Sequence, residues 1–97
     1  MIDLTRDQFI AFCLKQGPKK YDPTDVWNCA FSQFFRSEVP EIRSTTVDFD
    51  DGLVEGIDPQ WARIAELQLE GSEVEIVMQM GQTFADIASQ FEGGEAR

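Results

Sequence analysis

Two pairs of carboxylates stand at positions where they could present negative charge in a regular row. Asp48 and Asp50 form one pair and Glu73 and Glu75 the other, each in a segment where polar and apolar residues alternate. Alternation predicts a β-strand, so each pair is expected to point outward from a sheet, about 6.6 Å apart at a rise of about 3.3 Å per residue. A DNA strand advances about 3.4 Å per phosphate. This spacing therefore favours electrostatic imitation of a phosphate row.

The charge distribution of the chain extends this interpretation. The 97 residues carry a formal net charge of −10, and all of it lies in residues 48–97, which hold twelve acids against Arg63 and Arg97. A field of one sign attracts basic surfaces, whereas ordinary soluble surfaces mix both signs. The acids expected to stand in for phosphates are Asp48, Asp50, Asp51, Glu73 and Glu75, and those expected to extend the footprint are Glu55, Asp58, Glu66 and Glu70. The strand pairs alone favour another interpretation, in which the acids lie on different surfaces and only keep the protein soluble.

The residue types give little support to catalysis or to a metal or cofactor site. The chain has no histidine, which excludes histidine acid–base catalysis and histidine-containing acyl-transfer triads. Cys13 and Cys29 fall among apolar residues at helical spacing and are expected to be reduced core residues. Lys19 and Lys20 form the only local basic cluster and are expected to lie in a solvated loop. We therefore expect no enzyme, no metal and no cofactor.

The elements that would hold the acids follow from capping signals and hydrophobic periodicity. Helices are predicted over about 6–16, over about 23–37, in a short segment after Asp58-Pro59 that includes residues 61–67, and from Thr83 to the Gly93-Gly94 stop. Strands are predicted at 45–49 and 73–78, with a turn at 50–52.

These elements predict an α+β fold in a single domain, residues 1–97. We expect a small antiparallel sheet of two to three strands with three to four helices packed on one face. Residues 1–40 form the helical, charge-neutral part and residues 41–97 the mixed, strongly acidic part. The longest apolar run, Phe9 to Leu14, is far too short to span a bilayer. A cytosolic protein is the expectation.

A resemblance to small phage and prophage proteins is carried by the stretch Lys20-Tyr21-Asp22-Pro23-Thr24-Asp25-Val26-Trp27-Asn28-Cys29-Ala30-Phe31-Ser32-Gln33-Phe34. In those proteins an aromatic and an acid precede an Asn-Cys-Ala step, and a Gln–aromatic pair follows. A small, strongly acidic phage protein in turn resembles the DNA-mimicking anti-CRISPR inhibitors of type I-F surveillance complexes. The resemblance implies a non-enzymatic inhibitor in the cytoplasm of the bacterial host. Its partner would be the basic DNA-binding surface of a CRISPR surveillance complex, with no direct binding to nucleic acid or membrane.

Two other classes of function remain open. One is a phage accessory or regulatory protein that binds a host protein through a hydrophobic interface, with Trp61, Phe84 or Phe91 as the decisive contacts. The other is a module that binds calcium or another cation through acids between Asp48 and Asp58. That segment lacks the D-x-D-x-D-G loop with a glutamate at the twelfth position, so calcium is the weakest of the three.

Overall fold

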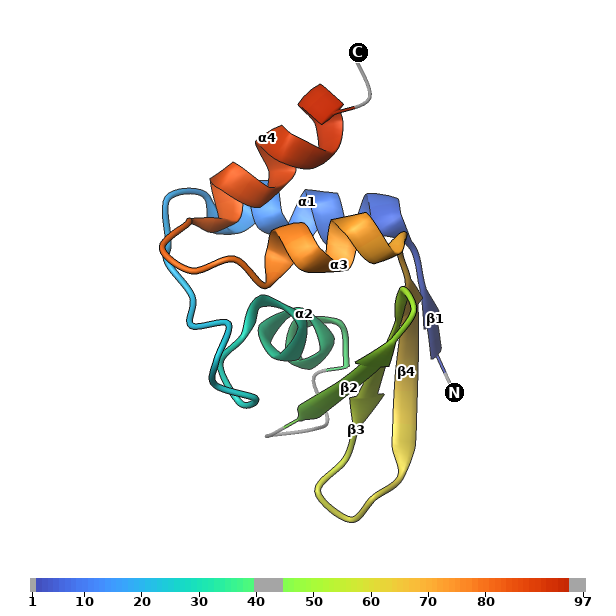
Figure 1. Ribbon diagram of the computed structural model, residues 1–97. Coiled ribbons are helices and arrows are strands. Elements are labelled where there is room, and N and C mark those ends of the chain that lie inside the picture. Colours follow the sequence, from blue (N-terminus) through green and yellow to red (C-terminus); the bar gives the residue numbers. More distant parts are fainter. Residues whose placement is uncertain (1, 40–44, 95–97) are drawn as a thin grey trace.

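The computed structural model describes residues 2–39 and 45–94, and these residues form a four-stranded sheet and four helices (Figure 1). In chain order the elements are β1 (Ile2–Leu4), α1 (Arg6–Gln16), α2 (Ala30–Glu38), β2 (Thr46–Asp50), β3 (Leu53–Ile57), β4 (Arg63–Gln68), α3 (Gly71–Val77) and α4 (Phe84–Gly94). The strand order is β1-β4-β3-β2, with β1 parallel to β4 and the other neighbours antiparallel. The α+β class is confirmed, but the sheet is mixed and has four strands, where two to three antiparallel strands were expected.

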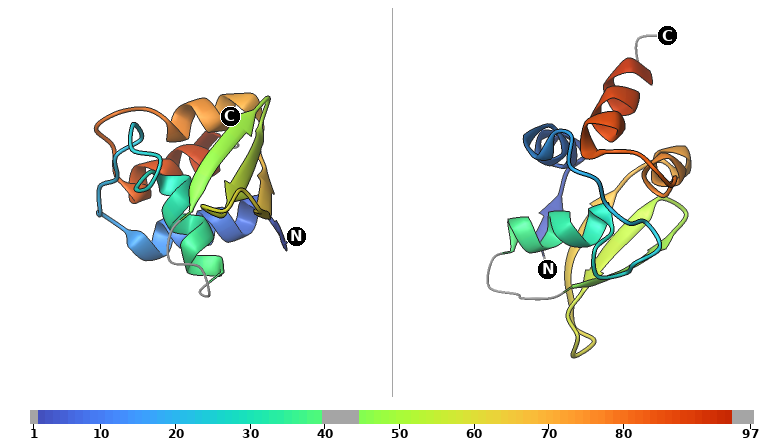
Figure 2. Two further views of the ribbon diagram at one scale, coloured as in Figure 1. Left: turned by 90° about the horizontal axis from the view of Figure 1, so that it is seen from below. Right: turned by 90° about the vertical axis from the view of Figure 1, so that its left-hand side faces the viewer.

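Of the four described helices, one covers a face of the sheet and the other three lie beyond its end (Figures 1 and 2). Figures 1 and 2 show α2 beside one face, with α1, α3 and α4 grouped beyond the end of the sheet where β4 leads into α3. Between α1 and α2 the aromatic rings pack on one another: the Phe9 ring lies 5.3 Å from that of Phe31 and 5.1 Å from that of Phe34, between centroids. The opposite face of the sheet has no described helix against it. In the described residues no helix is long and apolar enough to cross a membrane.

Several local predictions are confirmed. Helix α1 begins after Thr5, whose hydroxyl accepts from the Gln8 backbone N–H at 3.1 Å while the Gln8 side chain accepts from the Thr5 N–H at 2.8 Å. Strand β2 and helix α4 lie close to the predicted segments. The turn at Asp51-Gly52 has φ values of 50° and 90°, typical of the two-residue hairpin turns that fit the twist of a sheet. A Cβ on Gly52 would stand 2.2 Å from the carbonyl oxygen of Leu69, so this turn requires glycine.

The predicted helix over 23–37 is too long at its start, because α2 begins only at Ala30. Two aspartates hold the preceding segment in turns. Asp22 accepts from the backbone N–H of Thr24 at 3.0 Å, and Asp25 accepts from that of Trp27 at 2.9 Å. Such side-chain bonds offer the backbone an alternative to helical hydrogen bonds. The Asp-Pro signal therefore marks a turn here and not a helix start.

The short helix predicted over 61–67 is wrong, because residues 63–67 of this segment belong to strand β4 and residues 61 and 62 to the loop before it. Its partner β3 was not predicted at all. Ala65 and Leu67 are buried while Glu66 and Gln68 are more exposed, which is the period of two that a sheet imposes. Asp58 does not cap a helix; its carboxylate accepts from the Gln60 N–H at 2.8 Å inside the β3–β4 loop.

The strand predicted over 73–78 is also wrong, because residues 71–77 form helix α3. Glu70 and Glu73 make a capping box: the Glu73 carboxylate accepts from the Glu70 N–H at 3.0 Å, and the Glu70 side chain accepts from the Glu73 backbone. Val74 and Val77, three residues apart, are the buried residues of this helix. Polar and apolar residues do alternate over 73–78, but the segment is short enough for this pattern to fit a strand or a helix.

Candidate functional site

One row of carboxylates crosses the whole sheet. The strand register places Asp48 opposite Glu55, Glu55 opposite Glu66, and Glu66 opposite Asp3. Each of the four strands thus contributes one acid at the same level. We call Asp3, Glu66, Glu55 and Asp48 the carboxylate row. Residues opposite one another in adjacent strands have Cβ atoms about 4.5–5.5 Å apart, so these side chains share one surface.

The alternation of the strands places this row on the face away from the helices. Leu4, Val54 and Leu67 each follow or precede a row residue by one position, and all three are buried. On the buried face, the Phe35 ring of α2 lies so close to Gly56 that a Cβ there would come within 2.9 Å of the ring. Asp50 lies two residues after Asp48 on β2 and so shares its face. We call the carboxylate row together with Asp50 the acidic face.

Within residues 2–39 and 45–94, Arg63 is the single cation on the acidic face. Its guanidinium lies 3.0 Å from the Glu55 carboxylate and 3.9 Å from that of Glu66. Irregular pairing between β3 and β4 puts Arg63, and not Ile64, opposite Ile57. This bulge turns Arg63 outward, whereas strict alternation would have turned it toward the core with Ala65. Five carboxylates against one guanidinium leave the face strongly negative.

The row is unfavourable for the stability of the sheet. Like charges directly opposite each other on neighbouring strands are destabilising, by up to about 1 kcal/mol a pair. Arg63 relieves the two central acids, but no described ion pair reaches Asp3 or Asp48 at the ends, and both of these residues are exposed. Among the described residues, the negative charge is therefore least compensated at the two edges of the sheet.

Of the nine acids singled out from the sequence, four meet on this face: Asp48, Asp50, Glu55 and Glu66. Asp3 belongs with them and was missed. The signal for it is only the three-residue alternation Ile2-Asp3-Leu4, which is too short to identify a strand.

Three further acids lie at the two ends of the sheet. Asp51 occupies the β2–β3 turn, and Glu70 stands just before α3, whose first residue Gly71 lies against that turn. Asp58 is at the opposite end, in the β3–β4 loop. These acids border the acidic face but do not belong to its row.

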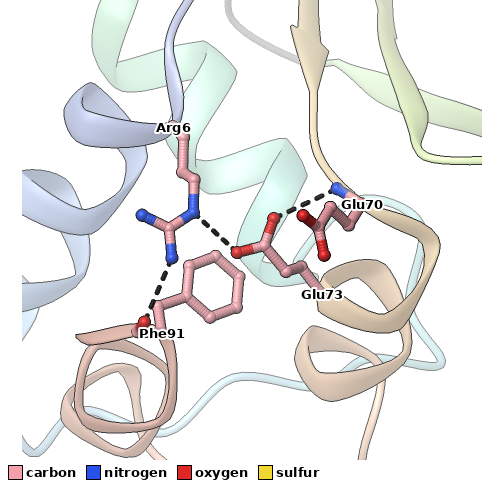
Figure 3. Close-up of polar contacts among 4 residues, drawn as sticks. All are labelled: Arg6, Glu70, Glu73 and Phe91. Atoms are coloured by element: carbon pink, nitrogen blue, oxygen red, sulfur yellow. Dashed lines mark hydrogen bonds and ion pairs between the residues drawn. The ribbon is translucent and has the colours of Figure 1, made fainter. Parts of the chain in front are cut away.

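Glu73 does not point outward from a strand, which corrects the position expected from the sequence. Its carboxylate lies 2.6 Å from the Arg6 guanidinium, and only 13% of its side chain is exposed (Figure 3). Arg6 also donates to the Phe91 carbonyl oxygen at 3.0 Å and stands 5.3 Å from the centroid of its ring. Glu73 thus joins α1, α3 and α4 inside the fold. Glu75 is exposed, but it stands on helix α3 and not beside Glu73 on a strand face.

Basic side chains gather on the other side of the molecule. Lys19, Lys20 and Arg36 line an open hollow of about 510 Å³ beside α2. The Lys19 ammonium donates to the side-chain oxygen of Gln33 at 3.0 Å, and both lysines are exposed, as expected for a solvated loop. Since α2 covers the inner face of the sheet, these cations are separated from the acidic face by the body of the protein.

The buried titratable groups do not form a reactive site. Burial raises the pKa of Cys13 to about 12, which keeps this thiol protonated and unreactive near neutral pH. Burial also raises the pKa of Tyr21 to about 12, although the hydrogen bond from Gln82 acts in the opposite direction. Within residues 2–39 and 45–94, no three His, Cys, Asp or Glu side chains are grouped so that they could hold a metal ion.

Comparisons of the chain with protein-family models, with curated proteins and with solved structures gave no match. The functional argument therefore depends on the geometry and charge of the acidic face.

Proposed function

We propose that this protein is a non-enzymatic inhibitor that imitates DNA, and that its acidic face occupies the basic DNA-binding surface of another protein. The carboxylate row carries the proposal, because it concentrates negative charge on one open face at a cost to the stability of the sheet. Solubility alone is served equally well by isolated acids such as Glu38, which is exposed at the end of α2.

The arrangement suits a partner that normally binds phosphates. Asp48 and Asp50 stand about 6.6–6.8 Å apart along β2, close to two phosphate steps of about 3.4 Å, and neighbouring strands add charges at about 4.8 Å across the sheet. The pattern is a two-dimensional array and not a single line. A surface of lysines and arginines that tracks a DNA backbone would meet several carboxylates at once.

The partner that we propose is a CRISPR surveillance complex of type I-F, in keeping with the resemblance of the sequence to small phage proteins. The protein would act in the cytoplasm of the bacterial host and would bind no nucleic acid itself, because its net charge of −10 opposes contact with phosphates.

The test is competition between this protein and fluorescently labelled duplex DNA for the purified surveillance complex. A triple variant, Asp3→Asn, Asp48→Asn and Asp50→Asn, removes three exposed charges from the acidic face. A control triple variant, Asp7→Asn, Glu38→Gln and Glu75→Gln, removes three exposed charges elsewhere.

We expect the wild-type protein and the control to displace DNA, with potency that falls as salt is raised. Three exposed charges at about 0.5 kcal/mol each predict that the acidic-face variant competes about tenfold more weakly. Equal potency of the two triple variants would exclude the acidic face as the binding surface. Failure of the wild-type protein to displace DNA would exclude this partner.

The alternative of a hydrophobic interface through Phe84 or Phe91 finds no support, because these side chains are 0% and 2% exposed. Trp61 is different, since 85% of it is exposed. We expect Trp61 to contact the partner protein close to the end of the acidic face.

A further inference from the structure

Both tryptophans of the chain line one small hollow. Trp27, Thr46, Asp58, Pro59 and Trp61 surround a space of about 190 Å³ with mostly apolar walls. The chain has only two tryptophans. The hollow lies where β2 begins and β3 ends, next to the β3–β4 loop that projects at the bottom of Figure 1.

Trp61 is held there in a strained backbone conformation. Its φ is +67°, in the left-handed region that a bulky residue rarely adopts. The loop imposes this conformation: the Trp61 N–H donates to the Asp58 carbonyl oxygen at 2.7 Å, and the Asp58 N–H donates to that of Ala62 at 2.7 Å. Because the side chain is 85% exposed, the strain is not offset by burial of the ring in the core. Strain and exposure together point to a contact with something outside the chain.

Trp27 is fixed on the other side of the hollow by hydrogen bonds to its backbone. Its N–H donates to the Asp25 carboxylate at 2.9 Å, and its carbonyl oxygen accepts from the Arg36 guanidinium at 2.6 Å. The ring is 43% exposed. The hollow is therefore bordered by two indole side chains whose backbones are held in place without a ligand.

The chemistry of these walls selects a cation. The face of an indole ring is negative and attracts cations, Arg more often than Lys. Asp58 adds a full negative charge, and its carboxylate already accepts a hydrogen bond from Gln60, which leaves further lone pairs for a ligand. A purely apolar ligand would bury that carboxylate with no cation beside it, which is unfavourable for a charged group. A planar guanidinium can stack on an indole and donate to a carboxylate at the same time.

We propose that this hollow binds the guanidinium group of an arginine on a partner protein. The identity of that partner rests on the proposed function, since a basic DNA-binding surface supplies arginines beside the acidic face. The hollow would then fix the orientation of the complex, while the acidic face supplies long-range attraction. Recognition of the guanidinium itself is a property of this chain alone and can be measured without the partner.

The experiment is an NMR titration of the two indole N–H signals with N-acetyl-arginine amide. The matched probe is N-acetyl-citrulline amide, which has nearly the same shape but no charge. We expect saturable shifts of both signals with the arginine probe and at least fivefold weaker binding of the citrulline probe. Equal binding of the two probes, or shifts that never saturate, would overturn the proposal. Tighter binding of N-acetyl-leucine amide would show an apolar site instead and would also overturn it.

Two variants test the walls separately. Asp58→Asn keeps an oxygen for the Gln60 N–H and should weaken arginine binding about fivefold, from an interaction of about 1 kcal/mol at 4 Å in water. Trp61→Asn should weaken it about two- to fivefold, and it suits the left-handed conformation, so the fold is retained. Met80→Asn, at another exposed apolar residue, should change nothing. Wild-type affinity in both wall variants would contradict the site.

The outcomes separate the two proposals. The Asp3, Asp48 and Asp50 triple variant leaves the walls of the hollow intact, so it should bind the arginine probe within about twofold of wild type. If the arginine probe binds but the protein does not displace DNA, only the proposed function fails. If DNA is displaced but the arginine and citrulline probes bind alike, only the proposal that the hollow binds a guanidinium fails.

Discussion

Arg63 allows a prediction in which stability and binding change in opposite directions. Arg63→Gln removes the guanidinium that pairs with Glu55 and Glu66 on the acidic face. The two central acids of the carboxylate row would then face each other without compensation. We expect the variant to be less stable than the wild-type protein and to bind a basic partner more tightly.

The magnitude follows from the two ion-pair distances. At 3.0 Å and 3.9 Å, unit charges attract by about 1.4 and about 1.1 kcal/mol in water. At physiological salt, screening over about 8 Å lowers the combined attraction to about 1.6 kcal/mol. The Arg63 side chain is 50% exposed, so the ordering of this mobile side chain offsets part of that gain. We expect a loss of about 1 kcal/mol in the free energy of unfolding, and a fall of about 4–8 °C in Tm.

Urea unfolding at low and high salt measures this effect. The difference between wild type and Arg63→Gln should shrink by about half between 0.15 M and 1 M salt, because the Debye length falls to about 3 Å. In a background that also carries Glu55→Gln and Glu66→Gln, the Arg63 substitution should cost almost nothing. Lys15→Gln, which removes an exposed cation from α1, is the control and should change stability by only a few tenths of a kcal/mol. An unchanged loss in the double-glutamine background would refute the electrostatic account of Arg63.

Three further predictions concern the fold. Glu73→Gln should lower the free energy of unfolding by about 1–2 kcal/mol in a urea titration, because it removes the charge paired with Arg6. Gly52→Ala should cost more than about 2 kcal/mol in the same assay, since a Cβ would collide with backbone only 2.2 Å away at a φ of +90°. The pKa values of Cys13 and Tyr21 rise to about 12 on folding from 9.0 and 10.0, so the stability that they contribute is complete below pH 9 and is lost as the pH rises toward 12. A Tm that stays constant between pH 9 and pH 11 would contradict the burial of these two groups.

The elements that were predicted correctly carry their information locally. The capping box of α1 and the Asp51-Gly52 turn each depend on residues within four positions of one another. The failures at 61–67 and 73–78 have the opposite origin. Both segments are short enough to satisfy periods of 2 and of 3.6. Their structures depend on partners distant in sequence, β1 beside β4 and Arg6 beside α3.

The acidic face could be predicted only in part for the same reason. Asp48 and Asp50 follow from the alternation within one strand. Their alignment with Glu55 and Glu66 requires the register of two hairpins, and β3 was not recognised in the sequence. Asp3 joins the row only because β1 pairs in parallel with a strand about sixty residues later, a contact that no local signal encodes.

The division of charge along the sequence therefore differs from the division of charge in space. Asp3 comes from the neutral half of the chain and Arg63 from the acidic half, yet both stand on the acidic face. The fold adds an acid to one end of the row and uses a bulge to place a cation near its centre. The cation relieves the row where repulsion is greatest, and no ion pair within residues 2–39 and 45–94 reaches Asp3 or Asp48 at the edges. Among the residues that the structure describes, no ion pair has to be displaced before a basic partner contacts those two acids, so the charges that cost the sheet stability are the ones most available for binding.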